Sequence, residues 1–527
     1  MQYSKVDYPK KTIWLIGIAI IVKIALSFLL ELGNDEVYYY TYAVQPDWNH
    51  FDHPPMVGWL IQLSTLNLNW VSTLSMRLGS ILAAASATWI IFRTGALIYN
   101  ERAGWIAALL YTCSIYTSII AGLFIMPDSP QLLFFTGSIY LMIKWVVKPH
   151  LFTKLNWLLL GALIGLATLS KVHGLYLWIG FGGFLLFHQL KTLKQPFLYI
   201  AVVITLLALI PILYWNIEYD FITYKFHSKR VLHSGIQVAS FFQQIAGEFF
   251  YQNPLVYISC LIPLLRFKKL KAIFQVQSTS NQKSTSLVSL LLWLSLPLIA
   301  LFWSISLFNP TLPHWTGPGF IALFLLAGVY WSETSKKLIP NLIQWALGFF
   351  VVLVIGFIGL VHVFPIQLGS KSPDNLGEYN PINDVTGWNQ FSAEFKTLVQ
   401  QDTSGGSGGM QAKAPILVSK WFPAGHILFY TARSTQKQVI AIGALEDVHK
   451  FAWLNQDQPN LQIGQDAYFI QPSNLPFDPT NSILPFFEKM EKTDTIQIKQ
   501  RNVLLRTFYV YRFKNCQKIP APILPRK

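Results

Sequence analysis

The chain has 527 residues, of which 53% are hydrophobic and only 12% are charged. The charged fraction is about half that of an average soluble protein, which excludes an ordinary soluble globular chain and predicts a protein that needs lipid as solvent. The net charge of +15 does not predict a nucleic-acid partner, because the basic residues form no stripe with interleaved aromatic residues. Three widely spaced cysteines provide neither a disulfide framework nor a Cys-rich metal site.

Apolar stretches long enough to cross a bilayer, roughly 20 residues each, recur between residues 12 and 364. The first stretch follows Lys10-Lys11 and lacks a small-residue cleavage site, so we expect it to remain as an anchor. We therefore expect a transmembrane domain over 1–364 and a soluble domain over 365–527. The predicted membrane spans are 12–32, 72–98, 103–122, 130–147, 156–170, 174–188, 197–217, 253–266, 287–308, 317–332 and 341–364.

The Lys and Arg residues of the connections predict the orientation. Nearly all would lie on one side, which the positive-inside rule assigns to the cytoplasm. The N-terminus is then cytoplasmic, and the C-terminal domain of this multi-pass protein is extracytoplasmic. Lys23 lies in mid-span, where it either snorkels or faces the bundle interior. The outer connections hold only Lys171, Lys225, Lys229 and Arg230.

The C-terminal domain shows both helical and strand patterns. Apolar residues between 388 and 399 recur at helical spacing. Short β-branched and aromatic runs predict strands at 415–421, 438–443, 466–470 and 507–513. A small α/β domain is the simplest interpretation, with the Ser/Gly-rich run at 404–409 as a flexible loop.

Three predicted outer loops, 33–70, 123–130 and 218–252, hold most of the polar chemistry of the membrane half. The first contains Gly33-Asn34-Asp35-Glu36 and, further on, Asp52-His53-Pro54-Pro55. An acidic pair at the outer end of the first span could supply a general base for an acceptor hydroxyl. It could also cap a helix, with Asn34 or Asp35 as N-cap and acidic charge in the first turn. The two roles are compatible.

Asp128, in Met126-Pro-Asp-Ser-Pro130, either belongs to the same site or performs ordinary turn chemistry. Lys171, before Val172-His173, lies at an outer interface against the positive-inside trend. It either binds a lipid phosphate or snorkels to anionic headgroups, and Arg77 allows the same two interpretations. In Pro313-His314-Trp315, the tryptophan is typical of an interfacial aromatic belt, whereas His314 could face the site.

In this order along the chain, the motifs resemble the bacterial branch of the dolichyl-phosphate-mannose–protein mannosyltransferase family, which includes the lipid A aminoarabinose transferases. The likeness covers nearly the whole chain. The matching pieces are Asp35-Glu-Val-Tyr-Tyr39, Asp52-His-Pro-Pro55, Arg77-Leu-Gly-Ser80, Pro127-Asp-Ser-Pro130, Ser170-Lys171, Pro313-His-Trp315 and Gly387-Trp388.

This resemblance implies a type C glycosyltransferase fold, a polytopic helical bundle with an extracytoplasmic C-terminal α/β domain. It implies that Asp35, beside Glu36, is the catalytic base and that Asp128 lines the site. Lys171 would bind the phosphate of the carrier. The aminoarabinose enzymes tend to have Pro-Arg-Tyr after the acidic pair and Glu-Lys-Pro where this chain has Asp52-His53-Pro54, which favours a broader group of membrane glycosyltransferases.

We therefore expect an inverting hexosyl- or pentosyltransferase that moves a sugar from a polyprenyl-phosphate carrier to a hydroxyl of lipid A or another glycolipid, a protein or an envelope glycan. Donor phosphate binding is assigned to Lys171, with help from His53, Arg77 and Arg230. Acceptor or cavity lining is assigned to Tyr39, Asp52, His173 and His314. Asp35, Asp128 and His53 could also form an oxygen-rich site for a divalent metal ion.

Two other classes remain open on the sequence. A secondary transporter of an envelope precursor would place ionisable residues at mid-membrane in two related halves, whereas here the acids lie in outer loops and no repeat is visible. A scaffold or receptor would use the C-terminal domain as a binding module.

Overall fold

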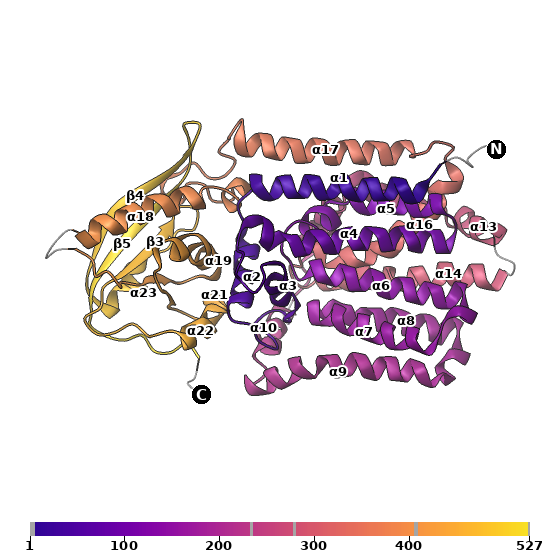
Figure 1. Ribbon diagram of the computed structural model, residues 1–527, viewed down its shortest axis with the longest axis horizontal. Coiled ribbons are helices and arrows are strands. Elements are labelled where there is room, and N and C mark those ends of the chain that lie inside the picture. The colour runs from indigo at the N-terminus through magenta and orange to yellow at the C-terminus, as the bar shows by residue number, and fades with distance from the viewer. Residues whose placement is uncertain (1–5, 232–234, 278–280, 405–408, 525–527) are drawn as a thin grey trace. The chain divides into compact units, whose positions relative to one another are not determined.

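The computed structural model describes residues 6–231, 235–277, 281–404 and 409–524 (Figure 1). Its contacts divide the chain into two compact units. The first, called here the helical unit, comprises Met1–Ala25, Trp48–Ser64 and Leu74–Leu353. The second, called the sheet unit, comprises Leu26–Asp47, Thr65–Thr73 and Val354–Lys527.

The helical unit is built of α-helices joined by short turns. Its elements are α1 (Tyr8–Leu29, whose end belongs to the sheet unit), α3 (Met56–Ser64), α4 (Thr73–Ile98), α5 (Glu101–Cys113), the π-helix η1 (Tyr116–Ile120), α6 (Asp128–Val147), α7 (Lys154–Ser170), η3 (Val172–Leu175), α8 (Tyr176–His188), α9 (Pro196–Glu218), α10 (Ile222–Val231), α11 (Val238–Tyr251), α12 (Pro254–Leu265), α13 (Phe267–Gln277), α14 (Asn281–Trp293), α15 (Leu296–Ser306), the 3-10 helix η5 (Pro313–Gly319), α16 (Phe320–Thr334) and α17 (Asn341–His362, shared with the sheet unit).

Among the described residues, 7 helical stretches are long and apolar enough to cross a membrane. They are α1, α4, α6, α9, Ser286–Ser306, Pro313–Thr334 and α17, and three shorter apolar helices accompany them at Lys154–Ser170, Val172–His188 and Pro254–Leu265. All the predicted spans fall on helices, because a bilayer leaves no other way to satisfy the backbone of a single apolar segment. The polytopic helical architecture is confirmed, whereas the number of spans stays a prediction.

Small residues bring the central helices close together. A Cβ on Gly104 of α5 would lie 2.2 Å from the carbonyl oxygen of Phe92 in α4, and one on Gly328 of α16 would lie 2.5 Å from the carbonyl oxygen of Ala103. Side chains from Phe320 to Tyr330 of α16 are buried almost without exception. Close backbone approach of this kind is how helices associate where lipid provides no hydrophobic driving force.

The long outer loops of the prediction contain helices of their own. Loop 33–70 holds α2 (Asn34–Val44) and α3, and loop 218–252 holds α10 and α11. These helices are too short or too polar to resemble membrane spans, so hydropathy alone does not reveal them.

The sheet unit contains a 5-stranded sheet of strand order β2-β1-β3-β5-β4. The strands are β1 (Ile416–Val418), β2 (Val439–Ala441), β3 (Ala467–Pro472), β4 (Phe487–Gln500) and β5 (Val503–Cys516). β1 pairs in parallel with β2 and β3, whereas β5 pairs antiparallel with β3 and β4. The predicted C-terminal α/β fold is confirmed. β4 was not predicted, because its sequence FEKMEKTDTIQIKQ is too polar to stand out as a strand.

Helices accompany the sheet (Figure 1). They are α18 (Trp388–Ser404), α19 (Trp421–His426), α20 (Arg433–Thr435), α21 (Leu445–Val448), α22 (Phe451–Leu454) and α23 (Pro479–Ser482). α18 packs through aromatic rings: Phe391 stacks on Phe508 of β5 at 4.1 Å, and Phe395 meets Tyr468 of β3 at 5.4 Å.

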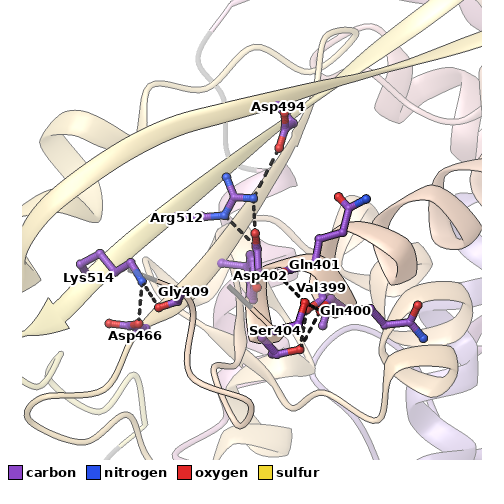
Figure 2. A network of polar contacts seen from close by, with 12 residues as sticks. Val399, Gln400, Gln401, Asp402, Ser404, Gly409, Asp466, Asp494, Arg512 and Lys514 are labelled. Atoms are coloured by element: carbon purple, nitrogen blue, oxygen red, sulfur yellow. Dashed lines mark hydrogen bonds and ion pairs between the residues drawn. The ribbon is translucent and has the colours of Figure 1, made fainter. Parts of the chain in front are cut away.

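A partly buried ion pair fixes the end of α18 to β5 (Figure 2). The Oδ2 atom of Asp402 accepts hydrogen bonds from Arg512 Nε at 2.7 Å and from the Tyr468 hydroxyl at 2.8 Å. On β5, Lys514 Nζ lies 3.1 Å from Oδ2 of Asp466, which precedes β3. These carboxylates are satisfied inside the fold, so the network is structural.

The contact-based division differs from the predicted boundary at 364/365, because Leu26–Asp47 and Thr65–Thr73 group with the C-terminal residues. Helix α2, whose first turn contains the predicted catalytic acids, is packed against α19 within the sheet unit: a Cβ on Gly425 would lie 2.9 Å from Val37 Cγ2. The first outer loop is therefore built partly as an extension of the sheet unit.

Candidate active site

A buried ion pair lies at the centre of the candidate site in the helical unit. Lys171 Nζ lies 2.8 Å from Asp128 Oδ2, with side-chain exposures of 5% and 1%. Asp128 opens α6, where the helix dipole favours a carboxylate. Lys171 directly follows α7, and its carbonyl oxygen accepts from Gln131 Nε2 at 3.3 Å. Two predicted site residues 43 positions apart in the chain are thus brought into direct contact.

Tyr116 completes the environment of this carboxylate. Its hydroxyl donates to Asp128 Oδ1 at 2.7 Å, so both carboxylate oxygens are occupied. Tyr116 is the first residue of the π-helix η1, an element that often occurs at functional sites. Gly317 of η5 makes room for the ring, because a Cβ there would lie 2.2 Å from Tyr116 Cε1.

Three histidines lie within electrostatic range of the pair. The charges of Lys171 and Asp128 act on His53, His173 and His314. The ring of His173 lies 4.9 Å from that of Phe302 and 6.2 Å from that of Trp315. The site is therefore a buried polar cluster with aromatic walls.

The charge state of His53 follows from its surroundings. Burial lowers its pKa to about 4, while Asp52 raises the pKa and Lys171 lowers it. His53 is therefore neutral near pH 7 and can offer a hydrogen bond to a phosphate but no permanent positive charge.

The remaining predicted residues of this unit lie in different settings. The backbone oxygen of Asp52 accepts from His227 Nε2 at 3.0 Å, which ties α10 to the first loop. Arg77 is fully buried in α4, 5.6 Å from the ring centre of Phe124. Arg230 belongs to α10, and its side chain lies outside what the structure describes.

The acidic pair of the first loop belongs to the sheet unit. Gly33 is the N-cap of α2, and both acids lie in its first turn. The Gly33 amide donates to Glu36 Oε2 at 2.9 Å, so Glu36 is buried and occupied with capping. Asp35 is exposed. Tyr39, one turn further, is buried with its ring 5.5 Å from Tyr38. Of the two acids, Asp35 is therefore the exposed one.

Residues far along the chain hold the start of α2. The Asn34 amide donates to Asp384 Oδ1 at 2.7 Å, and His426 Nε2 donates to the Asn34 side-chain oxygen at 2.9 Å. The imidazole of His426 stacks on Trp388 with ring centres 4.0 Å apart and planes 3° apart. Burial holds the pKa of His426 well below its usual range, so it acts as a neutral donor.

The sequence analysis missed two residues of the helical unit. Tyr116 gave no signal, because a tyrosine inside an apolar span is common. Glu248 of α11 is fully buried, accepts from Trp303 Nε1 at 3.1 Å, and has its pKa raised by burial to about 7. A lone acid in the apolar run from Phe241 to Tyr251 was the signal that could have found it.

The structure brings together Asp128, Lys171 and the three histidines. Asp35, Glu36 and Tyr39 belong to the other unit, so the convergence of the two sets stays a prediction. Both oxygens of Asp128 are taken by Tyr116 and Lys171. Within the described ranges, no group of three His, Cys, Asp or Glu side chains is placed to hold a metal ion. The predicted metal site of Asp35, Asp128 and His53 draws on both units and stays a prediction.

Comparisons with known proteins point to one family. Residues 52–215 match the family described as dolichyl-phosphate-mannose-protein mannosyltransferase. Over 420 residues the chain is 24% identical to lipid A galacturonosyltransferase RgtD of Rhizobium johnstonii, an alignment that covers 77% of this chain and 79% of RgtD.

Two solved structures have a fold similar to that of this chain. ArnT from Cupriavidus metallidurans in the apo state gives a TM-score of 0.63 at 13% identity, covering 96% of this chain and 98% of ArnT. ArnT from the same organism bound to undecaprenyl phosphate gives a TM-score of 0.60 at 13% identity, covering 94% of this chain and 97% of ArnT. The predicted fold is confirmed: the chain has the type C glycosyltransferase fold of ArnT, and its sequence is similar to that of the mannosyltransferase family over residues 52–215 and to that of RgtD.

Proposed function

We propose that the protein transfers a sugar from a polyprenyl-phosphate carrier to an acceptor hydroxyl, with inversion at the anomeric carbon, on the periplasmic side of the inner membrane. The observation that carries this proposal is the buried Asp128–Lys171 pair with its surrounding histidines. A membrane protein that buries ionisable groups together uses them in function far more often than for stability. The undecaprenyl phosphate bound to one structural relative and the lipid A acceptor in the name of the curated relative support the donor and acceptor classes.

Lys171 is the proposed ligand of the donor phosphate. One of its ammonium hydrogens points to Asp128, which leaves two for a phosphate oxygen. Asp128 holds the ammonium in place, and the Tyr116 hydroxyl holds Asp128. When the bond from the anomeric carbon to the phosphate oxygen breaks, the electron pair leaves with the phosphate. A fixed cation beside that oxygen stabilises the developing charge.

Asp35 is the proposed base. Its exposed carboxylate lies in the first turn of α2, where a negative charge interacts favourably with the helix dipole. It would take the proton of the acceptor hydroxyl while that oxygen forms its bond to the anomeric carbon. The phosphate is a good leaving group, so the mechanism needs no general acid.

Purified protein incubated with a panel of polyprenyl-phosphate sugars, followed by mass analysis of lipid A, glycolipid and protein acceptors, tests the function. Asp35→Asn should lose transfer by about 10² or more, the lower range for removing a general base, and should keep the wild-type thermal midpoint. Asp374→Asn, an exposed acid of the same unit, is the matched control. Near-normal turnover of Asp35→Asn would remove the assigned role. Adding a chelator to the same assay tests metal dependence separately.

A further inference from the structure

The sheet unit contains a cavity of about 370 Å³ next to the ends of two membrane helices. Its lining combines the end of α1 (Phe28, Leu29 and Leu30) with polar residues of the C-terminal segment. His362, the last residue of α17, also lines it, and its Nε2 donates to the Leu29 carbonyl at 2.8 Å. The ends of α1 and α17 are therefore adjacent, and both open onto the same cavity.

Large apolar side chains are exposed at the ends of both helices. The side chain of Phe28 is 68% exposed, and Phe364, just after α17, is 71% exposed. Large apolar side chains that are exposed on apolar helices of membrane-spanning length are expected to contact acyl chains. The apolar side of the cavity is thus continuous with a surface that meets the bilayer.

Another part of the lining is polar and comes from the end of β4, next to its turn into β5. Lys499 and Gln500 line the cavity, together with Asn389 at the start of α18. Arg501, at the tip of the turn, donates to the carbonyl of Val363 at 2.9 Å. The strand turn of the water-soluble sheet is thereby fixed to the end of a membrane helix.

Two features of this wall suggest a ligand. The Oε1 atom of Gln500 is buried and has no hydrogen-bond partner among the described residues, which costs free energy unless a donor arrives. The exposed Lys499 supplies a cation. The acid of the cavity, Glu31, accepts hydrogen bonds from the amides of Trp388 at 2.8 Å and Asn389 at 3.1 Å.

We propose that this cavity binds the head of an anionic membrane lipid that carries a phosphate and hydroxyl groups. Lys499 contacts the phosphate, Gln500 Oε1 accepts from a headgroup hydroxyl, and the acyl chains lie along Phe28 and the exposed face beside α17. The volume of the cavity lies within the range of pockets that enclose small ligands. The lipid comes either from the bilayer or from the pool of phosphorylated glycolipid acceptors. Binding needs no sugar transfer, so this proposal and the proposed function can fail independently.

Native mass spectrometry of the full-length protein in detergent tests the site with dioleoyl phosphatidylglycerol, the choline counterpart, and inorganic phosphate as probes. We expect wild type to retain phosphatidylglycerol over phosphatidylcholine. Lys499→Glu should reduce the retained fraction of phosphatidylglycerol about fivefold or more, because one basic residue at an anionic surface contributes about a factor of five to binding and this variant also reverses the charge. Lys396→Glu, an exposed lysine of α18 outside the cavity, should retain the lipid. Equal retention by Lys499→Glu, or no preference between the two lipids, would overturn the proposal.

A second measurement does not depend on any variant. A photoactivatable phosphatidylglycerol should label peptides that contain 28–31, 385–390 or 498–500 in the wild-type protein. Labelling confined to other segments, or binding of inorganic phosphate without lipid, would contradict a lipid site. Competition by a phosphorylated glycolipid in the same labelling experiment identifies the acceptor pool as the source, and its failure to compete identifies the bilayer.

Discussion

Asp128 and Lys171 share a site in which neither charge is in contact with water. Removing one member of such a pair leaves the other charge buried without compensation, which commonly costs about 3–5 kcal/mol, whereas replacing both by neutral groups can be nearly free. The pair should therefore contribute both to the stability of the fold and to sugar transfer, and these two contributions can be separated experimentally.

Lys171→Met should lower the thermal midpoint of the purified protein, because it leaves the Asp128 carboxylate buried without a cation. It should also abolish transfer. The double variant Asp128→Asn with Lys171→Met should recover most of the midpoint while transfer stays absent, since no cation meets the donor phosphate. Thermal unfolding in detergent and the transfer assay measure the two effects. A single Lys171→Met variant as stable as wild type would show that the pair is not buried as described.

At the scale of elements, the site depends on two irregular helical segments meeting: the π-helix η1 and the 3-10 helix η5. Gly317 of η5 contacts the ring of Tyr116, the first residue of η1. That contact directs the Tyr116 hydroxyl at Asp128. Neither segment contains an acid, yet together they set the orientation of the carboxylate.

Gly317→Ala should displace the Tyr116 ring, because the new Cβ would lie 2.2 Å from Cε1, and should reduce the transfer rate. Gly348→Ala in α17 is the control. A Cβ there meets nothing within 4 Å, and alanine in a helix is favoured by about 1 kcal/mol. The transfer rate and the thermal midpoint of both variants are the measurements. Unchanged activity in Gly317→Ala would mean that Tyr116 does not position Asp128.

The predictable elements were those whose signal is local. Membrane helices follow from hydropathy, and β1, β2, β3 and β5 follow from short apolar runs. Asp128 and Lys171 were found because both stand at the outer ends of spans. Tyr116 and Gly317 were not, because their role exists only through a contact between segments about 200 residues apart. A helix start near Asn34 was foreseen, but its N-cap is Gly33 and not Asn34 or Asp35. The partners of Asn34, Asp384 and His426, could not be read from local sequence.

At the scale of the whole molecule, stability should depend on pH through Lys450 in the sheet unit. This side chain is 1% exposed, and burial lowers its pKa to about 8, with the charges of Asp47 and Asp457 opposing the shift. Its ordinary pKa is 10.5. Between about pH 8 and 10.5 the unfolded chain binds more protons than the folded chain at this position, so its contribution to stability rises with pH in that window.

Lys450→Met should raise the thermal midpoint at pH 7 and flatten its rise between pH 8 and 10.5, because no proton is then exchanged at this position on unfolding. Lys420→Met, at an exposed lysine of the same unit, should leave the wild-type profile unchanged. Thermal unfolding at intervals across this range checks the result. A Lys450→Met profile parallel to wild type would contradict the assignment.

The start of α2 has a consequence for biosynthesis. The hydrogen-bond partners of Asn34 lie 350 and 392 positions later in the chain. While the ribosome is still making the membrane helices, the first turn that carries Asp35 lacks both of them. The first turn of α2 can take its observed arrangement only after translation has passed residue 426, so a chain truncated before that residue would carry Asp35 and Glu36 without the partners that fix this turn.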